Sequence, residues 1–274
     1  MRSALFAAIC IGLTVSIGAV PLLAQMQNNI EKHMTCDKRG YDGERARHCE
    51  IREQTLSSVG RLSVEGHNGG ATVKGWLRSD VLVRARVEAV AESQAAADLL
   101  ASRVSVDSGG GQVRSLGPDS LENSWWSVSY EVFVPQTTDL SVKTHNGGVT
   151  ISDVRGQIRF EGHNGGVDLR RVAGDVAGNT HNGGIQVELM GSIWDGRQLD
   201  VSTYNGGINV AMPAGYSAHV QAETSSGRIH SDFPLMVNGE LRPRRLDTNM
   251  GSGGPLIHLT THNGQVVLKR AGSQ

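Results

Sequence analysis

Leu140-Ser141-Val142-Lys143-Thr144-His145-Asn146-Gly147-Gly148-Val149-Thr150-Ile151 is the stretch of the chain that decides the fold. Its central Asn-Gly pair recurs in nearly the same frame, with the asparagines at Asn68, Asn146, Asn164, Asn182, Asn205 and Asn263. Asn146, Asn164 and Asn182 are 18 residues apart, and the step to Asn205 is 23 residues. A short repeat of this kind is typical of a solenoid, in which each coil stacks on its neighbour. We expect Thr224-Ser225-Ser226-Gly227 to form the next coil after Asn205.

Alternating apolar residues flank each Asn-Gly pair, which is the pattern of short strands with one buried face. Two sets of aliphatic residues align from coil to coil, Val149, Val167, Ile185 and Ile208 in one and Ile151, Leu169, Val187 and Val210 in the other. Asn followed by Gly suits a type I′ bend with the asparagine in a left-handed conformation, and stacked amides can also form a hydrogen-bonded ladder. We therefore predict an all-β fold, a β-solenoid or β-helix of stacked coils of about 18–23 residues over residues 57–270.

Two segments interrupt this repeat. Residues 92–103 are rich in alanine and leucine with an apolar stripe, which predicts one inserted α-helix packed across an end or side of the β structure. Phe233 to Gly254 is a longer excursion with two prolines and several glycines, and we expect it to be an exposed functional loop.

The N-terminal region has the features of an exported protein. Residues 1–24 combine Arg2 with a long apolar stretch, which indicates a signal peptide or, if uncleaved, an N-terminal membrane anchor. Residues 25–56 form a polar segment in which Cys36 and Cys49 favour a local disulfide over a zinc site with His33 and His48. We expect a periplasmic, cell-surface or extracellular location.

The composition limits the classes of partner. The formal net charge is −1, so no strong field attracts nucleic acid or anionic lipid, and membrane contact is expected only through an uncleaved N-terminal segment. Glycine contributes 35 of 274 residues and aromatic residues only 4%, which fits a thin aliphatic core with many tight bends.

The order of a first β segment, an alanine-rich helix, a tryptophan-containing strand and the Leu140 to Ile151 type of coil resembles the bacterial putative-adhesin family of exported β-solenoid proteins. The resemblance covers roughly residues 57 to 270 and implies a fold and an exported location. It implies no catalytic residue, because the family is largely uncharacterised.

Three histidines precede the asparagines of consecutive coils, namely His145, His163 and His181, and Tyr204 holds the next equivalent position. Side chains stacked at the strand spacing of about 4.8 Å point in one direction, which favours a structural stack. The alternative is a metal-binding or pH-sensing histidine ladder, since neutral imidazoles readily bind transition metals.

The sequence holds no recognisable catalytic motif, and we expect no cofactor. Acidic residues alternate outward with Thr, Arg and Gln, as on the solvated face of a strand. Arg242, Arg244 and Arg245 form the most plausible contact for an acidic glycan. We therefore predict a non-enzymatic binding, adhesion or scaffold protein that contacts an envelope protein or glycan through its strand faces and residues 233–254. The alternative is an enzyme that acts on envelope polysaccharide in a solenoid groove.

Overall fold

The computed structural model describes residues 34–36, 45–57, 60–120, 123–234 and 243–271. Within these residues the strands form two ten-stranded sheets, and one α-helix, α2 (Gln94–Arg103), interrupts them. The prediction of an all-β solenoid with one inserted helix is confirmed. The predicted signal peptide or anchor, residues 1–24, lies outside the described residues.

Each sheet is named here by its strands in spatial order. Sheet A contains β1 (Ala46–Leu56), β4 (Val81–Ala91), β7 (Trp125–Pro135), β3 (Ala71–Trp76), β9 (Val149–Ser152), β11 (Val167–Arg170), β13 (Ile185–Glu188), β15 (Ile208–Met212), β20 (Val266–Arg270) and β17 (Ile229–Ser231). Sheet B contains β18 (Arg245–Met250), β16 (Ala218–Thr224), β19 (Leu256–Asn263), β14 (Gln198–Asn205), β12 (Ala173–Asn182), β10 (Arg155–Asn164), β8 (Asp139–Asn146), β2 (Arg61–Asn68), β6 (Gln112–Leu116) and β5 (Ser105–Asp107).

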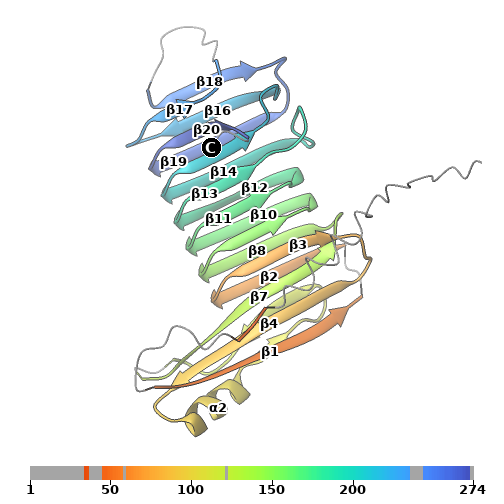
Figure 1. The fold of residues 1–274 in the computed structure, drawn as a ribbon, viewed down its shortest axis with the longest axis vertical. Coiled ribbons are helices and arrows are strands. Elements are labelled where there is room, and N and C mark those ends of the chain that lie inside the picture. Colours follow the sequence, from red (N-terminus) through yellow and green to blue (C-terminus); the bar gives the residue numbers. More distant parts are fainter. Residues whose placement is uncertain (1–33, 37–44, 58–59, 121–122, 235–242, 272–274) are drawn as a thin grey trace, which may run out of the picture. The chain divides into compact units, whose positions relative to one another are not determined.

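Each Asn-Gly turn joins a strand of sheet B to a strand of sheet A, so one coil contributes to both sheets (Figure 1). Neighbouring coils pair in parallel and in register, with Val149 opposite Val167 and Val167 opposite Ile185. Like residues therefore stack on like, and the inward rows from the two sheets bury each other. These aliphatic rows form the core, because their apolar surface is removed from water along the whole stack.

The order of the coils in space differs from their order in the sequence. Strand β14 pairs with β19, and β19 pairs with β16, so the coil of Asn263 lies between the coils of Asn205 and Ser225. The expectation that residues 224–227 directly follow the Asn205 coil was wrong. The coil of Asn263 carries the full His-Asn-Gly motif and therefore matches the Asn205 coil more closely at the turn.

The segment between the first coil and Asp139 builds one end of the stack. Strands β7 and β4 extend sheet A, and β6 and β5 extend sheet B. Helix α2 contacts β4 and β1, and its buried residues Ala97 and Ala101 lie against this end of the structure. The helix packs against β4, whose Val87 is fully buried, and covering an end in this way keeps apolar surface of a solenoid from water.

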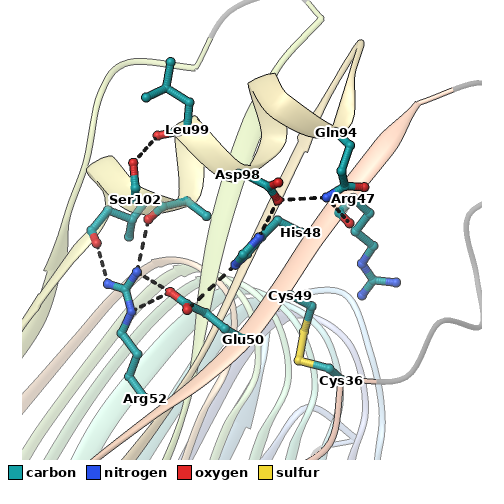
Figure 2. A network of polar contacts seen from close by, with 12 residues as sticks. Cys36, Arg47, His48, Cys49, Glu50, Arg52, Gln94, Asp98, Leu99 and Ser102 are labelled. Atoms are coloured by element: carbon teal, nitrogen blue, oxygen red, sulfur yellow. Dashed lines mark hydrogen bonds and ion pairs between the residues drawn. A yellow bond between two sulfur atoms is a disulfide. The ribbon is translucent and has the colours of Figure 1, made fainter.

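Helix α2 is held by its own N-terminal cap and by polar side chains of β1, which Figure 2 shows. Ser93 caps its N-terminus by accepting a hydrogen bond from the backbone N–H of Ala96. At the other end, Arg52 donates to the carbonyl oxygen of Ala101 at 3.1 Å. His48 Nδ1 and Asp98 Oδ1 are 2.8 Å apart in the middle of the helix. A disulfide joins Cys49 of β1 to Cys36, and the two cysteines are 13 residues apart in the sequence.

The second half of the predicted functional loop is a strand. Strand β18 pairs antiparallel with β16 and buries Leu246, Thr248 and Met250. The interpretation of 233–254 as one exposed loop was therefore wrong for residues 245–250. The alternation of these three residues with polar neighbours is an ordinary strand pattern, and β18 covers an edge of β16 that would otherwise be unpaired.

Burial of Tyr130 in β7 makes the fold sensitive to alkaline pH. Its side chain is 1% exposed, and burial raises the pKa of its phenol from 10.0 to about 12. Because the folded-state pKa lies above the unfolded value, the associated stability is fully present below pH 10 and is lost as the pH rises towards 12. The free energy of unfolding of the parent should fall between pH 9 and pH 12. In Tyr130→Phe we expect this fall to be about 2 kcal/mol smaller, as measured by urea denaturation.

Tyr204→Phe is the matched control, because Tyr204 is 45% exposed. Burial also raises the pKa of Tyr216, so part of the alkaline loss should remain in both variants. An alkaline loss in Tyr130→Phe equal to that of the parent would contradict this assignment.

Candidate functional site on the outer face of sheet B

The asparagine side chains form a hydrogen-bonded column along the turns. Asn164 donates from Nδ2 to Oδ1 of Asn146 at 2.9 Å and accepts from Asn182 at 2.8 Å. The same bond, at 2.8 Å, joins Asn146 to Asn68, Asn205 to Asn182 and Asn263 to Asn205. Each internal amide uses one donor and one acceptor within the column, so the amides link neighbouring coils.

The backbone at these turns differs from the prediction. Among the described non-glycine residues, positive φ occurs at Asp153 and Arg171 and at none of the asparagines, so the type I′ assignment was wrong. The glycine is required for a different reason. A Cβ on Gly165 would lie 2.3 Å from the carbonyl oxygen of Gly147 in the adjacent coil. The turns approach too closely for any side chain at this position.

The residues before the asparagines form a second column of stacked rings. Ring centroids lie 4.6 Å apart for His145 and His163, 5.3 Å for His163 and His181, and 4.9 Å for His181 and Tyr204. The column extends at both ends, to His67 at 5.3 Å and His262 at 4.6 Å. Interplanar angles of 3° to 11° make the stack nearly parallel. All of these side chains are exposed.

This geometry gives no support to a single metal ion held by the histidines. Parallel rings point their nitrogens in the same direction, whereas ligands must converge at about 2.1 Å on one point. Across the part of the chain that the structure describes, no group of three His, Cys, Asp or Glu side chains could hold a metal ion.

Two adjoining shallow hollows on the outer face of sheet B share lining residues. The first, of about 400 Å³, is lined by Ala177 and Gly178 of β12, and we call it the β12 hollow. Its rim is formed by Ser141, Lys143, Arg159, Glu161, Asn179, Asp200 and Ser202. The second, of about 310 Å³, shares Asn179 and Ser202 with it and runs beside the rings of His181, Tyr204 and His262 as far as Ser225.

Ion pairs hold the charged residues around the β12 hollow. Lys143 Nζ lies 3.0 Å from Glu161, and an Nη of Arg159 lies 3.2 Å from Asp175. Asp200 is 2.8 Å from Nδ1 of His258. The carboxylates of Glu161 and Asp200, on β10 and β14, therefore face the same hollow, and each has a nearby basic partner.

No sequence motif marks the β12 hollow. An alignment of the coils does indicate it, because Ala177 and Gly178 of β12 occupy the positions that Arg159 and Phe160 occupy in β10. Small residues at one coil between larger ones at its neighbours leave a depression, but only an alignment of outward positions reveals it.

The predicted basic cluster is only partly described. Arg244 and Arg245 are exposed at the start of β18, and Arg245 lies opposite Glu223. Arg242 lies outside the described residues. The structure does not bring Arg244 or Arg245 to the rim of the β12 hollow.

Loss of an internal amide should weaken the asparagine column. Asn164→Ala removes one donated and one accepted hydrogen bond, and we expect the free energy of unfolding to fall by about 1–2 kcal/mol in urea denaturation. Asn263 is the matched control, since among the described residues its amide makes one such bond, so Asn263→Ala should cost roughly half as much. Equal losses in the two variants would argue against an energetic contribution from the column.

Gly178 should tolerate no side chain, because it packs against Phe160. A Cβ at Gly178 would lie 2.3 Å from the carbonyl oxygen and 2.5 Å from Cγ of Phe160. We expect Gly178→Ala to lower the free energy of unfolding by about 1–3 kcal/mol in thermal or urea denaturation. Gly215→Ala is the control, because a Cβ there would meet nothing within 4 Å. If both variants are as stable as the parent, the packing described here is incorrect.

Several proteins of known structure are similar to this chain. No curated protein matches the chain. Among solved structures, it is similar to a putative cell adhesion protein from Clostridium sporogenes, with 11% identity, coverage of 81% of this chain and 100% of that chain, and a TM-score of 0.40. It is also similar to a putative adhesin from Bacteroides fragilis, with 12% identity, coverage of 81% and 97%, and a TM-score of 0.45.

A further similar structure is that of a putative lipid binding protein from Parabacteroides distasonis, with 8% identity, coverage of 82% of this chain and 95% of that chain, and a TM-score of 0.30. The profile of the Toastrack DUF4097 family matches residues 51–269, which is most of the sequence. The chain belongs to the Toastrack DUF4097 family.

Proposed function

We propose that this protein is an exported, non-enzymatic component of the cell envelope that binds an envelope protein or glycan through the outer faces of its coils. The observation that carries this proposal is the outer face of sheet B, much of which has no helix packed on it among the described residues. Parallel sheets are usually covered on both faces. The described helix, however, packs against β1, β4 and β7 and not against β8, β10, β12, β14 or β19 of sheet B. Outward side chains there, including Lys143 and Glu161, are exposed.

Export is supported by two features. The apolar residues 1–24 have the composition of a signal peptide or an anchor. The Cys36–Cys49 disulfide is of a kind that persists in oxidising compartments. Within the described residues, no helix has the length and apolar character needed to cross a bilayer. We place the protein in the periplasm, at the cell surface or outside the cell.

Exposed basic residues offer one further contact. Arg244 and Arg245 lie at the edge of sheet B, where a guanidinium can pair with a carboxylate or sulfate group. We propose them as a secondary contact for an acidic glycan.

An enzyme acting on polysaccharide is the second candidate, and one observation favours it. Glu161 and Asp200 face the same hollow, and glycosidases commonly use two carboxyl groups. In this structure Glu161 lies 3.0 Å from Lys143 Nζ and Asp200 lies 2.8 Å from His258 Nδ1, so each carboxyl group already contacts another side chain. The arrangement fits binding better than hydrolysis.

Retention by envelope material tests the proposal. The purified full chain, immobilised and incubated with separated envelope protein and polysaccharide fractions, should retain a component of at least one fraction. An exported protein of similar size and net charge serves as the control for nonspecific retention. Retention no greater than that of the control from every fraction would contradict a binding function. Release of reducing sugar ends by the parent but not by Glu161→Gln would instead establish the enzyme.

A further inference from the structure

The β12 hollow lies where β12 carries two small residues, Ala177 and Gly178. The inward ring of Phe160 occupies the space that a side chain at position 178 would need, so β12 carries glycine there. The adjacent outward residue, Ala177, is also small, while its neighbours in register are Arg159 on β10 and Asp200 on β14. A depression of about 400 Å³ results, within the usual size range of small-ligand sites.

Free hydrogen-bonding groups line this depression. The amide of Asn179 and the hydroxyl of Ser202 have no hydrogen-bond partner among the described residues, and both line the two adjoining hollows. An amide and a hydroxyl can each donate and accept hydrogen bonds. Groups with this dual capacity suit a ligand that also offers both, such as a sugar hydroxyl.

The charges around the β12 hollow balance. Lys143 and Arg159 contribute two positive charges, and Glu161 and Asp200 contribute two negative charges. These ionic groups are already held in pairs with one another or with Asp175 and His258. A charged ligand would have to compete with these pairs, whereas an uncharged ligand can hydrogen-bond to them without breaking them.

The strands that form the floor cannot accept an added peptide strand. Strand β12 is paired with β10 on one side and β14 on the other, so its backbone groups are used within the sheet. Peptides that bind sheets by their main chain need an unpaired edge. Recognition at this site must therefore use side chains, which favours a hydroxyl-rich ligand over an extended peptide.

We propose that the β12 hollow and the adjoining hollow beside His181, Tyr204 and His262 bind an uncharged, hydroxyl-rich oligosaccharide. This inference rests on the proposed function, of which it names the site and the ligand class. Asn179 and Ser202 contact the sugar hydroxyls, and the polar edges of the stacked rings form one wall. The open trough admits an extended chain that lies across several coils.

Filling the hollow tests this assignment. Ala177→Trp places a large side chain on the outer face of β12, and Asn179→Ala removes a single contact without added bulk. Ala211→Trp is the matched control, because Ala211 is a half-buried outward alanine on β15 in sheet A. Binding of neutral trisaccharides of glucose, mannose and N-acetylglucosamine to the full chain is measured by calorimetry, with unfolding curves recorded for each variant.

We expect at least one neutral trisaccharide to bind the parent. Ala177→Trp should bind it more than about tenfold more weakly, Asn179→Ala should weaken binding about threefold to tenfold, and Ala211→Trp should match the parent. If Ala177→Trp unfolds, Asn179→Ala decides the outcome alone.

Absence of binding to every neutral trisaccharide would overturn the inference, as would unchanged binding in both β12 variants. Binding only to an acidic oligosaccharide, lost in Arg244→Ser or Arg245→Ser, would also overturn it. If the parent still retains an envelope component in any of these cases, the proposed function stands. If the parent retains no envelope component either, both the inference and the proposed function are rejected.

Discussion

In-register parallel pairing between coils is the constraint on which the rest of this structure depends. It brings each residue within about 5 Å of its equivalent in the next coil. At the turns the backbones come closer still, so that Gly147 and Gly165 leave no room for a Cβ. The same proximity lets each asparagine amide bond to the next and each ring of the outer column stack on its neighbour. Polar and aromatic groups that are exposed singly elsewhere become continuous rows here.

The same pairing decides where a ligand can be accommodated. A stack of identical coils would present flat columns, and a depression forms only where one coil departs from its neighbours. On sheet B one such place is β12, where the small outward residue Ala177 stands between Arg159 and Asp200.

Several features could be predicted from local patterns, and others depended on contacts that local patterns do not contain. The aliphatic rows at Val149 and Ile151 and the helix near residues 92–103 follow from periodicity and propensity. The type I′ assignment failed because coil-to-coil approach, and not the twist of a hairpin, requires the glycine. Residues 245–250 were interpreted as a loop because the flanking prolines and glycines concealed a short alternating strand. The β12 hollow was missed because no motif marks it.

The sequence by itself determined that the chain stacks similar coils with asparagine, glycine and a ring at equivalent turn positions, since each coil carries the same short-range pattern. Only the tertiary structure decided which coils are neighbours. The coil of Asn263 lies between those of Asn205 and Ser225, although it is the last along the chain. The pairing surface of every coil is nearly the same, so local sequence cannot distinguish the alternatives. The choice rests on contacts between segments far apart in the chain, and these contacts also create the column of rings and the hollows beside it.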